Sequence, residues 1–213
     1  MSSVNRNGKR KLRSELTNRR KPELGYYLIV TDTEGTERVY FNGLRDSIKE
    51  TVGDKLIIKV IETKNRNMIK EAKEFLAELP QYADPWLVFD KDKNTKFDKI
   101  IEDAQNFDIE VAWSNPCIEV WFNAYFGKMP NCQDSVSCCN IFSKEYQKNV
   151  GQEYYKADNK LYAKLYKNGD EAKAIEIAYK KMQEQLRFGK TLPSEMVPAT
   201  TVYKLVNEIK SKI

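Results

Sequence analysis

The stretch that decides the fold runs from residue 85 to residue 94 and reads Pro85-Trp86-Leu87-Val88-Phe89-Asp90-Lys91-Asp92-Lys93-Asn94. The apolar run is short, rich in β-branched and aromatic residues, and follows a proline, so it predicts a buried strand. In an open parallel sheet, ligands bind beyond the carboxyl ends of the strands. Asp90 and Asp92 therefore stand at the position where such a sheet carries its site.

Two carboxylates this close in sequence repel each other unless a proton or a cation lies between them. A hard divalent ion such as Mg²⁺, or Mn²⁺ in its place, takes oxygen ligands, and Mg²⁺ typically uses only one or two carboxylates. Asp90 and Asp92 are therefore candidate metal ligands. An aspartate pair after a strand is also typical of a turn that caps the next helix, and the motif alone leaves both interpretations open.

Strand-like runs and helical periodicities alternate four times within the first 126 residues. The predicted strands cover 26–31, 56–61, 85–90 and 108–113, and the helices that follow them lie near 39–48, 65–79, 97–104 and 116–126. This alternation predicts an α/β fold with a mostly parallel four-stranded sheet flanked by helices. Further acids follow the first and fourth strands, namely Asp32, Glu34, Glu37 and Glu119. They would meet Asp90 if these strands are neighbours, and the sequence does not fix the strand order.

The character of the chain changes after residue 126. Residues 127–139 contain proline, asparagine and small polar residues and indicate a loop, whereas only helices are expected from about residue 140 onward. We expect this helical part, about 140–213, to cover the sheet within one α/β domain that spans residues 25–213.

The first 24 residues are predicted to be a basic, disordered arm. Residues 1–21 contain eight basic residues and one acid, so they carry a net charge of +7, against +5 for the whole chain. Such arms contact phosphate groups, or serve as solubilising tails. The candidate nucleic-acid-binding residues are Arg10, Lys11, Arg19 and Arg20 in the arm, with Lys91 and Lys93 beside the aspartates.

Composition limits the possible chemistry. The chain has no histidine, which excludes Ser-His-Asp triads, Cys-His pairs and histidine-ligated metals. Acid–base work would fall to carboxylates, lysines or tyrosines. The four cysteines, Cys117, Cys132, Cys138 and Cys139, match no common zinc-ligand spacing, so we expect reduced, partly buried thiols. No apolar run approaches 20 residues and the N-terminus lacks an apolar signal core, so we expect a cytoplasmic protein without a membrane span.

The chain resembles the RloB family, which includes AbiLii-type proteins of phage abortive-infection systems. The resemblance covers residues 26–208 and is specific in the order and spacing of its short motifs. These are Thr36-Glu37 with Tyr40-Phe41, Asp90-x-Asp92, Phe97-Asp98 with Ala104, Ser114-Asn115-Pro116-Cys117 with Glu119 and Trp121, and Thr201-Val202-Tyr203 with Leu205-Val206.

This resemblance implies a variant of the TOPRIM fold, a compact α/β domain in which a glutamate follows the first strand and Asp-x-Asp follows the third. In that wider group the acids bind Mg²⁺ to nick, cleave or join phosphodiesters. By that likeness Asp90 and Asp92 would hold the metal, Asp32 or Glu34 would complete the site, and Glu37 and Glu119 would be inward-facing supports. The family also implies a phage-defence role, often beside an ATPase partner encoded nearby.

The chain departs from the family pattern at two places. Relatives usually carry Glu-Gly before Thr-Glu, where this chain has Asp32-Thr33, or Glu34-Gly35 shifted by two, so the first catalytic acid is Asp32 or Glu34. Tyr125 stands where relatives commonly carry histidine. Two other functions remain open: a phosphotransferase or phosphatase with Asp90 as nucleophile and Asp92 as acid–base, and a non-catalytic defence module that acts through its ATPase partner.

Overall fold

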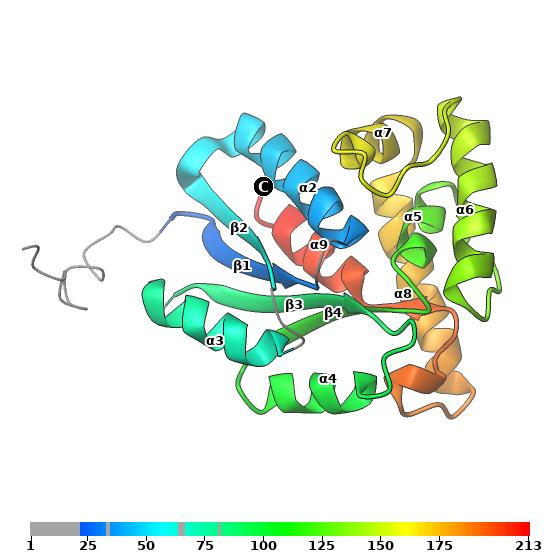
Figure 1. Cartoon of the computed structure of the whole chain (residues 1–213). Coiled ribbons are helices and arrows are strands. Elements are labelled where there is room, and N and C mark those ends of the chain that lie inside the picture. Colours follow the sequence, from blue (N-terminus) through cyan, green and yellow to red (C-terminus); the bar gives the residue numbers. More distant parts are fainter. Residues whose placement is uncertain (1–21, 33–34, 64–66, 81) are drawn as a thin grey trace, which may run out of the picture.

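The computed structural model describes residues 22–32, 35–63, 67–80 and 82–213. Strands and helices alternate through the first part of the chain, and helices dominate the second (Figure 1). In chain order the elements are β1 (Gly25–Thr31), α2 (Thr36–Val52), the 3₁₀ turn η1 (Gly53–Lys55), β2 (Leu56–Glu62), α3 (Met68–Glu78), β3 (Asp84–Asp90), α4 (Phe97–Gln105), β4 (Glu110–Asn115), α5 (Glu119–Tyr125), α6 (Ser135–Val150), α7 (Leu161–Asn168), α8 (Glu171–Arg187), η2 (Pro193–Glu195), β5 (Ala199–Thr200) and α9 (Val202–Lys210).

The strands form one mostly parallel sheet in the order β2-β1-β3-β4-β5. The α/β class and the parallel pairing of the first four strands are confirmed. The predicted strand number is wrong, because within the described residues the sheet has five strands. Ala199 and Thr200 pair antiparallel with Asn115 and Ser114. A two-residue strand shows no alternation of apolar and polar residues, so the sequence pattern contains no sign of it.

The sheet is covered on both faces, and successive residues of β1 supply both interfaces (Figure 1). Leu28 and Val30 pack with α3 and α4 on one face. Tyr27 and Ile29 pack with α2 and α9 on the other. Strands buried on both faces read as continuous apolar runs, which explains why β1 and β3 are recognisable in the sequence.

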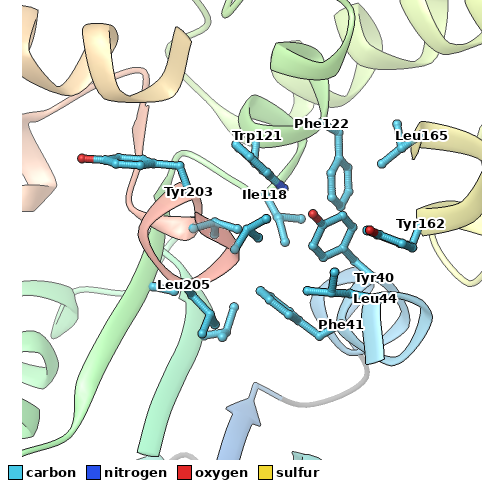
Figure 2. Packing of buried hydrophobic residues seen from close by; sticks show 14 of the residues in the cluster. Tyr40, Phe41, Leu44, Ile118, Trp121, Phe122, Tyr162, Leu165, Tyr203 and Leu205 are labelled. Atoms are coloured by element: carbon cyan, nitrogen blue, oxygen red, sulfur yellow. The ribbon is translucent and has the colours of Figure 1, made fainter. Parts of the chain in front are cut away.

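The C-terminal helices share their core with the sheet rather than building one apart from it. Figure 2 shows Tyr40, Phe41 and Leu44 of α2 facing aromatic and aliphatic side chains from α5, α7 and α9. The Tyr40 and Phe122 rings lie 5.3 Å apart, and Tyr40 and Tyr162 form an edge-on pair at 5.4 Å. Packing of this kind fixes the position of α5, which carries Glu119.

Helices dominate after about residue 140, as expected, but two departures matter for the site and for the sheet. Helix α6 ends at Val150, where Gly151 adopts φ 75° and its N–H donates to the Gln147 carbonyl, and a non-helical segment extends to Lys160. The short strand β5 is the second exception. At the other end, α6 begins at Ser135, inside the predicted loop, because the Asp134 side chain caps it.

The start of α5 also differs from expectation. Pro116 is not the first residue of the helix, because β4 ends at Asn115 and the helix begins only at Glu119. Among the described residues, no helix is both long enough and apolar enough to cross a membrane.

Candidate metal centre

The sheet order places three acid-bearing connections beside one another. Strands β1, β3 and β4 are neighbours, and their carboxyl ends face the same edge. Asp32 follows β1, Asp90 ends β3, and Glu119 begins the helix after β4. Glu37 joins them from the first turn of α2. From β1 the chain first builds the sheet outward on one side, with β2, and then on the other side, with β3 and β4. Ligands usually bind at the carboxyl ends of the strands beside such a reversal.

Glu37 is buried, with 7% of its surface exposed. Burial raises the pKa of its carboxyl group to about 7, and the negative charges of Glu119 and Asp32 act in the same direction. The glycine at residue 35, just before α2, leaves room for the Glu37 carboxyl group. A Cβ on residue 35 would lie 2.1 Å from Glu37 Oε2. Gly35 is therefore required for the Glu37 carboxyl group to lie where it does.

One oxygen of the Asp90 carboxyl group accepts a backbone hydrogen bond, and the other oxygen does not. Its Oδ2 accepts a hydrogen bond of 2.9 Å from the Ile118 N–H. Its Oδ1 is buried and has no hydrogen-bond partner among the described residues. Burial raises the pKa of Asp90 well above its usual range, and the nearby charges of Glu37 and Glu119 raise it further. The Glu37 carboxyl group is the hydrogen-bonding neighbour of Asp90, so either a proton shared between the two acids or a cation would satisfy this oxygen.

Glu119 is the most deeply buried of these acids, with 1% of its surface exposed. Its Oε1 accepts a hydrogen bond of 3.0 Å from the Tyr154 hydroxyl and lies 3.5 Å from Lys156 Nζ. Sequence reasoning missed Tyr154 and Lys156, because it treated their segment as helical. Gly151 is the signal that could have revealed it, since glycine commonly ends a helix and starts a loop.

Four of the predicted site residues are therefore brought together: Glu37, Asp90 and Glu119, with Asp32 at the exposed end of β1. We call them the acid cluster. The charges of these four residues act on one another, whereas Asp92, which was expected beside Asp90, contacts Ser135 instead. Glu34, the other candidate for the first acid, lies outside the described residues, as do Arg10, Lys11, Arg19 and Arg20.

Asp92 takes a different direction from Asp90. It is exposed, adopts φ 32°, and accepts a hydrogen bond of 2.7 Å from the Ser135 hydroxyl at the start of α6. Together with Lys91 and Lys93 it lines a cavity of about 270 Å³ that also borders Asn115. Its predicted metal-binding role stays a prediction, and its position is at the rim of this cavity.

Tyr125 lies in the core of the helical layer. Its hydroxyl is 2.7 Å from the Tyr40 hydroxyl and donates to Glu171 at 2.8 Å. Gly169 also packs closely here, since a Cβ on it would lie 2.8 Å from the Tyr125 carbonyl oxygen. The tyrosine thus has fixed neighbours of its own in this chain.

The residues present fit a hard divalent cation. Burial and the nearby negative charges raise the pKa of both Glu37 and Asp90, and a bound cation would relieve this cost. The unpartnered Oδ1 of Asp90 offers a ligand atom of the type that Mg²⁺ and Mn²⁺ prefer. Glu37, Asp90 and Glu119 would hold such an ion only after side-chain shifts, because among the described residues their carboxylate oxygens do not all lie within 4.8 Å of one another. Asp32 lies within electrostatic range of Glu37.

Comparison with known proteins adds the family to this geometry. The model of the RloB-like protein family matches residues 27–209, which include the acid cluster and every described strand except the first two residues of β1. Searches of curated proteins and of solved structures gave no match. The match covers most of the chain, and the chain therefore belongs to the RloB-like protein family.

Proposed function

We propose that this protein is a Mg²⁺- or Mn²⁺-dependent nuclease that cleaves phosphodiester bonds of DNA or RNA as the effector of a phage-defence system. The observation that carries the proposal is the acid cluster, in which Asp90 Oδ1 is buried without a partner among the described residues. Its place at the carboxyl ends of β1, β3 and β4 and the RloB-like membership support the proposal.

The bound divalent ion would polarise a phosphoryl oxygen and lower the pKa of a coordinated water. The chain's own residues would hold the ion and manage the proton. Glu37, with its pKa raised to about 7, is suited to accept and return a proton near neutral pH. Asp90 and Glu119 would supply the negative charge that retains the cation.

Two lysines near the acid cluster would contact the phosphate groups of the substrate. Lys91 and Lys93 border the 270 Å³ cavity, which is also lined by Ser135 at the start of α6. Two ammonium groups there would offset phosphate charge as a nucleic-acid strand passes the acids. The basic arm of residues 1–21 would raise the rate of encounter with the strand.

The test is cleavage of plasmid DNA and of tRNA with Mg²⁺ or Mn²⁺ by wild type and by Asp90→Asn. We expect cleavage by wild type, and a loss of at least about a hundredfold in Asp90→Asn, because the neutral amide lacks the negative charge with which the carboxylate retains the cation. Asp103→Asn is the matched control, since Asp103 lies on α4 and forms a surface ion pair with Lys99. Equal activity in wild type and Asp90→Asn would remove the assignment.

The same experiment separates the other functions. A phosphotransferase needs Asp90 as an ionised nucleophile open to phosphate, and the burial that raises its pKa disfavours this. A non-catalytic module would cleave nothing and would gain no stability from divalent ions. Thermal unfolding with Mg²⁺ against excess chelator decides this point, because a ligand at a hundredfold excess over its Kd stabilises by about 2.7 kcal/mol.

A further inference from the structure

The four cysteines of the chain converge between the start of α5 and α6. Cys117, Cys132 and Cys138 are buried in one small cluster around Val120, and the half-buried Cys139 packs against it. All four are free thiols. The spacing of Cys132, Cys138 and Cys139 in the sequence does not suggest a metal site. The fold brings Cys117, which precedes α5, next to the cysteines of α6, and the spacing in the sequence does not reveal this proximity.

Glu119 completes a compact group with two of these thiols. The Sγ atoms of Cys117 and Cys139 and one carboxylate oxygen of Glu119 all lie within 4.8 Å of one another. Two sulfurs bound to one tetrahedral zinc ion lie about 3.8 Å apart, given Zn–S bonds of about 2.3 Å. Small shifts of these side chains would therefore suffice. Cys117 and Glu119 approach from the start of α5, and Cys139 from α6, which packs against it (Figure 1).

We propose that Cys117, Cys139 and Glu119 form a site for a thiophilic divalent cation of the Zn²⁺ class. Thiolate ligands select such ions, whereas oxygen ligands suit Mg²⁺ and Mn²⁺. Glu119 belongs to both this site and the acid cluster, so the two ions compete for one carboxylate. If the proposed nuclease function holds, the thiophilic ion inhibits it by drawing Glu119 away from Asp90 and Glu37.

The surroundings allow such an ion to enter. Cys139 is half-buried, and Lys156, whose Nζ lies 3.5 Å from Glu119 Oε1, has a side chain that is 63% exposed. The ammonium group already places a positive charge beside this carboxylate, and its exposed side chain can move into solvent when a metal ion takes its place. Binding replaces the two thiol protons with the metal, so two protons are released for each ion bound when both thiols start protonated.

The experiment titrates the reduced full-length protein with Cd²⁺ and with Zn²⁺. Cadmium is followed by the ultraviolet charge-transfer absorption of its thiolate bonds, and zinc by calorimetry. We expect one ion per chain. Affinity should fall about tenfold or more in Cys139→Ser and in Glu119→Gln, as expected when a ligand is lost. Lys156→Met should bind more tightly than wild type, because it removes a competing charge.

Cys132→Ser is the matched control, because Cys132 belongs to the thiol cluster but not to the group of three ligands. It should bind both ions as wild type does, and far-ultraviolet circular dichroism of each variant confirms that it is folded. Absence of binding, binding that survives Cys139→Ser, or an equal loss in Cys132→Ser would overturn the site.

The readouts keep this site separate from the nuclease proposal. The cadmium signal reports the thiolates and needs no cleavage. A protein that binds cadmium through Cys139 but cleaves nothing would overturn the nuclease and leave the site standing. Cleavage with no cadmium binding would overturn the site alone. If both hold, Zn²⁺ should inhibit wild type far more than Cys139→Ser at the same Mg²⁺ concentration.

Discussion

The carboxyl group of Asp90 is the least satisfied acid among the described residues of the cluster. Oδ2 is fixed by the Ile118 N–H at 2.9 Å, while Oδ1 is buried without a partner among those residues. A buried polar atom left without a hydrogen bond costs about 1–3 kcal/mol. A proton or a cation removes that cost, so the folded chain favours whichever is available. At low divalent-ion concentration the proton is favoured, which couples the stability of the fold to pH.

Glu37 makes this coupling measurable. Its pKa is about 7 in the folded protein, above the ordinary value for glutamate, because of burial and then of the charges of Glu119 and Asp32. A raised folded-state pKa of an acid stabilises the fold fully below the unfolded-state pKa of about 4.3, and that contribution is lost as pH rises through about 7. In chelator, the free energy of unfolding of wild type should therefore fall between about pH 4.5 and 7, by on the order of a few kcal/mol.

Glu37→Gln should flatten this fall, since the amide does not titrate. Urea unfolding at a series of pH values measures the effect, and Glu50→Gln on the exposed side of α2 is the control. Saturating Mg²⁺ should also flatten it in wild type, because the cation favours the ionised acids. A fall of equal size in Glu37→Gln would show that Glu37 is not the titrating group.

Helices and strands with long hydrophobic patterns could be predicted from the sequence, and elements with short patterns could not. β1 and β3 are buried on both faces and stand out as apolar runs, and the helices between the strands show clear periodicity. β5 has two residues, too few for any pattern. The acids of the cluster were predictable because each follows a recognisable strand. The sequence does not predict the contacts of Glu119 with Tyr154 and Lys156, or the proximity of Cys117 to Cys139. Tertiary packing alone brings those segments together.

The contact between α2 and α7 depends on one glycine. A Cβ on Gly43 would lie 2.7 Å from Tyr162 Cβ. Tyr162 is only 1% exposed, and its Cβ is bonded directly to the backbone, so this atom has little freedom to move. Gly43→Ala should gain at most about 1 kcal/mol in helix propensity and lose about 1–3 kcal/mol to overpacking. We expect net destabilisation in thermal unfolding. Ser47→Ala, one turn later on α2, controls for propensity, and a Gly43→Ala protein that melts above wild type would contradict the packing.

Charge is distributed unevenly across the whole molecule. Residues 1–21 carry +7, which leaves the rest of the chain near −2, and that remainder holds the acid cluster. A body of this charge attracts nucleic acid weakly, so the arm would supply most of the electrostatic attraction in the proposed function. Salt dependence of binding can therefore identify which part of the chain contacts phosphate.

A variant in which the eight basic residues of 1–21 become glutamine keeps the arm's length and removes its charge. For duplex DNA the slope of log affinity against log salt changes by about 0.9 for each phosphate that the protein no longer neutralises. We expect a slope several units shallower and weaker binding at low salt, measured by fluorescence anisotropy. Lys91→Gln with Lys93→Gln removes two charges beside the cavity and should change the slope by at most about 2 units. If the arm variant kept the wild-type slope while the double variant did not, the lysines beside the acid cluster would make the phosphate contacts, and the arm would act as a solubilising tail.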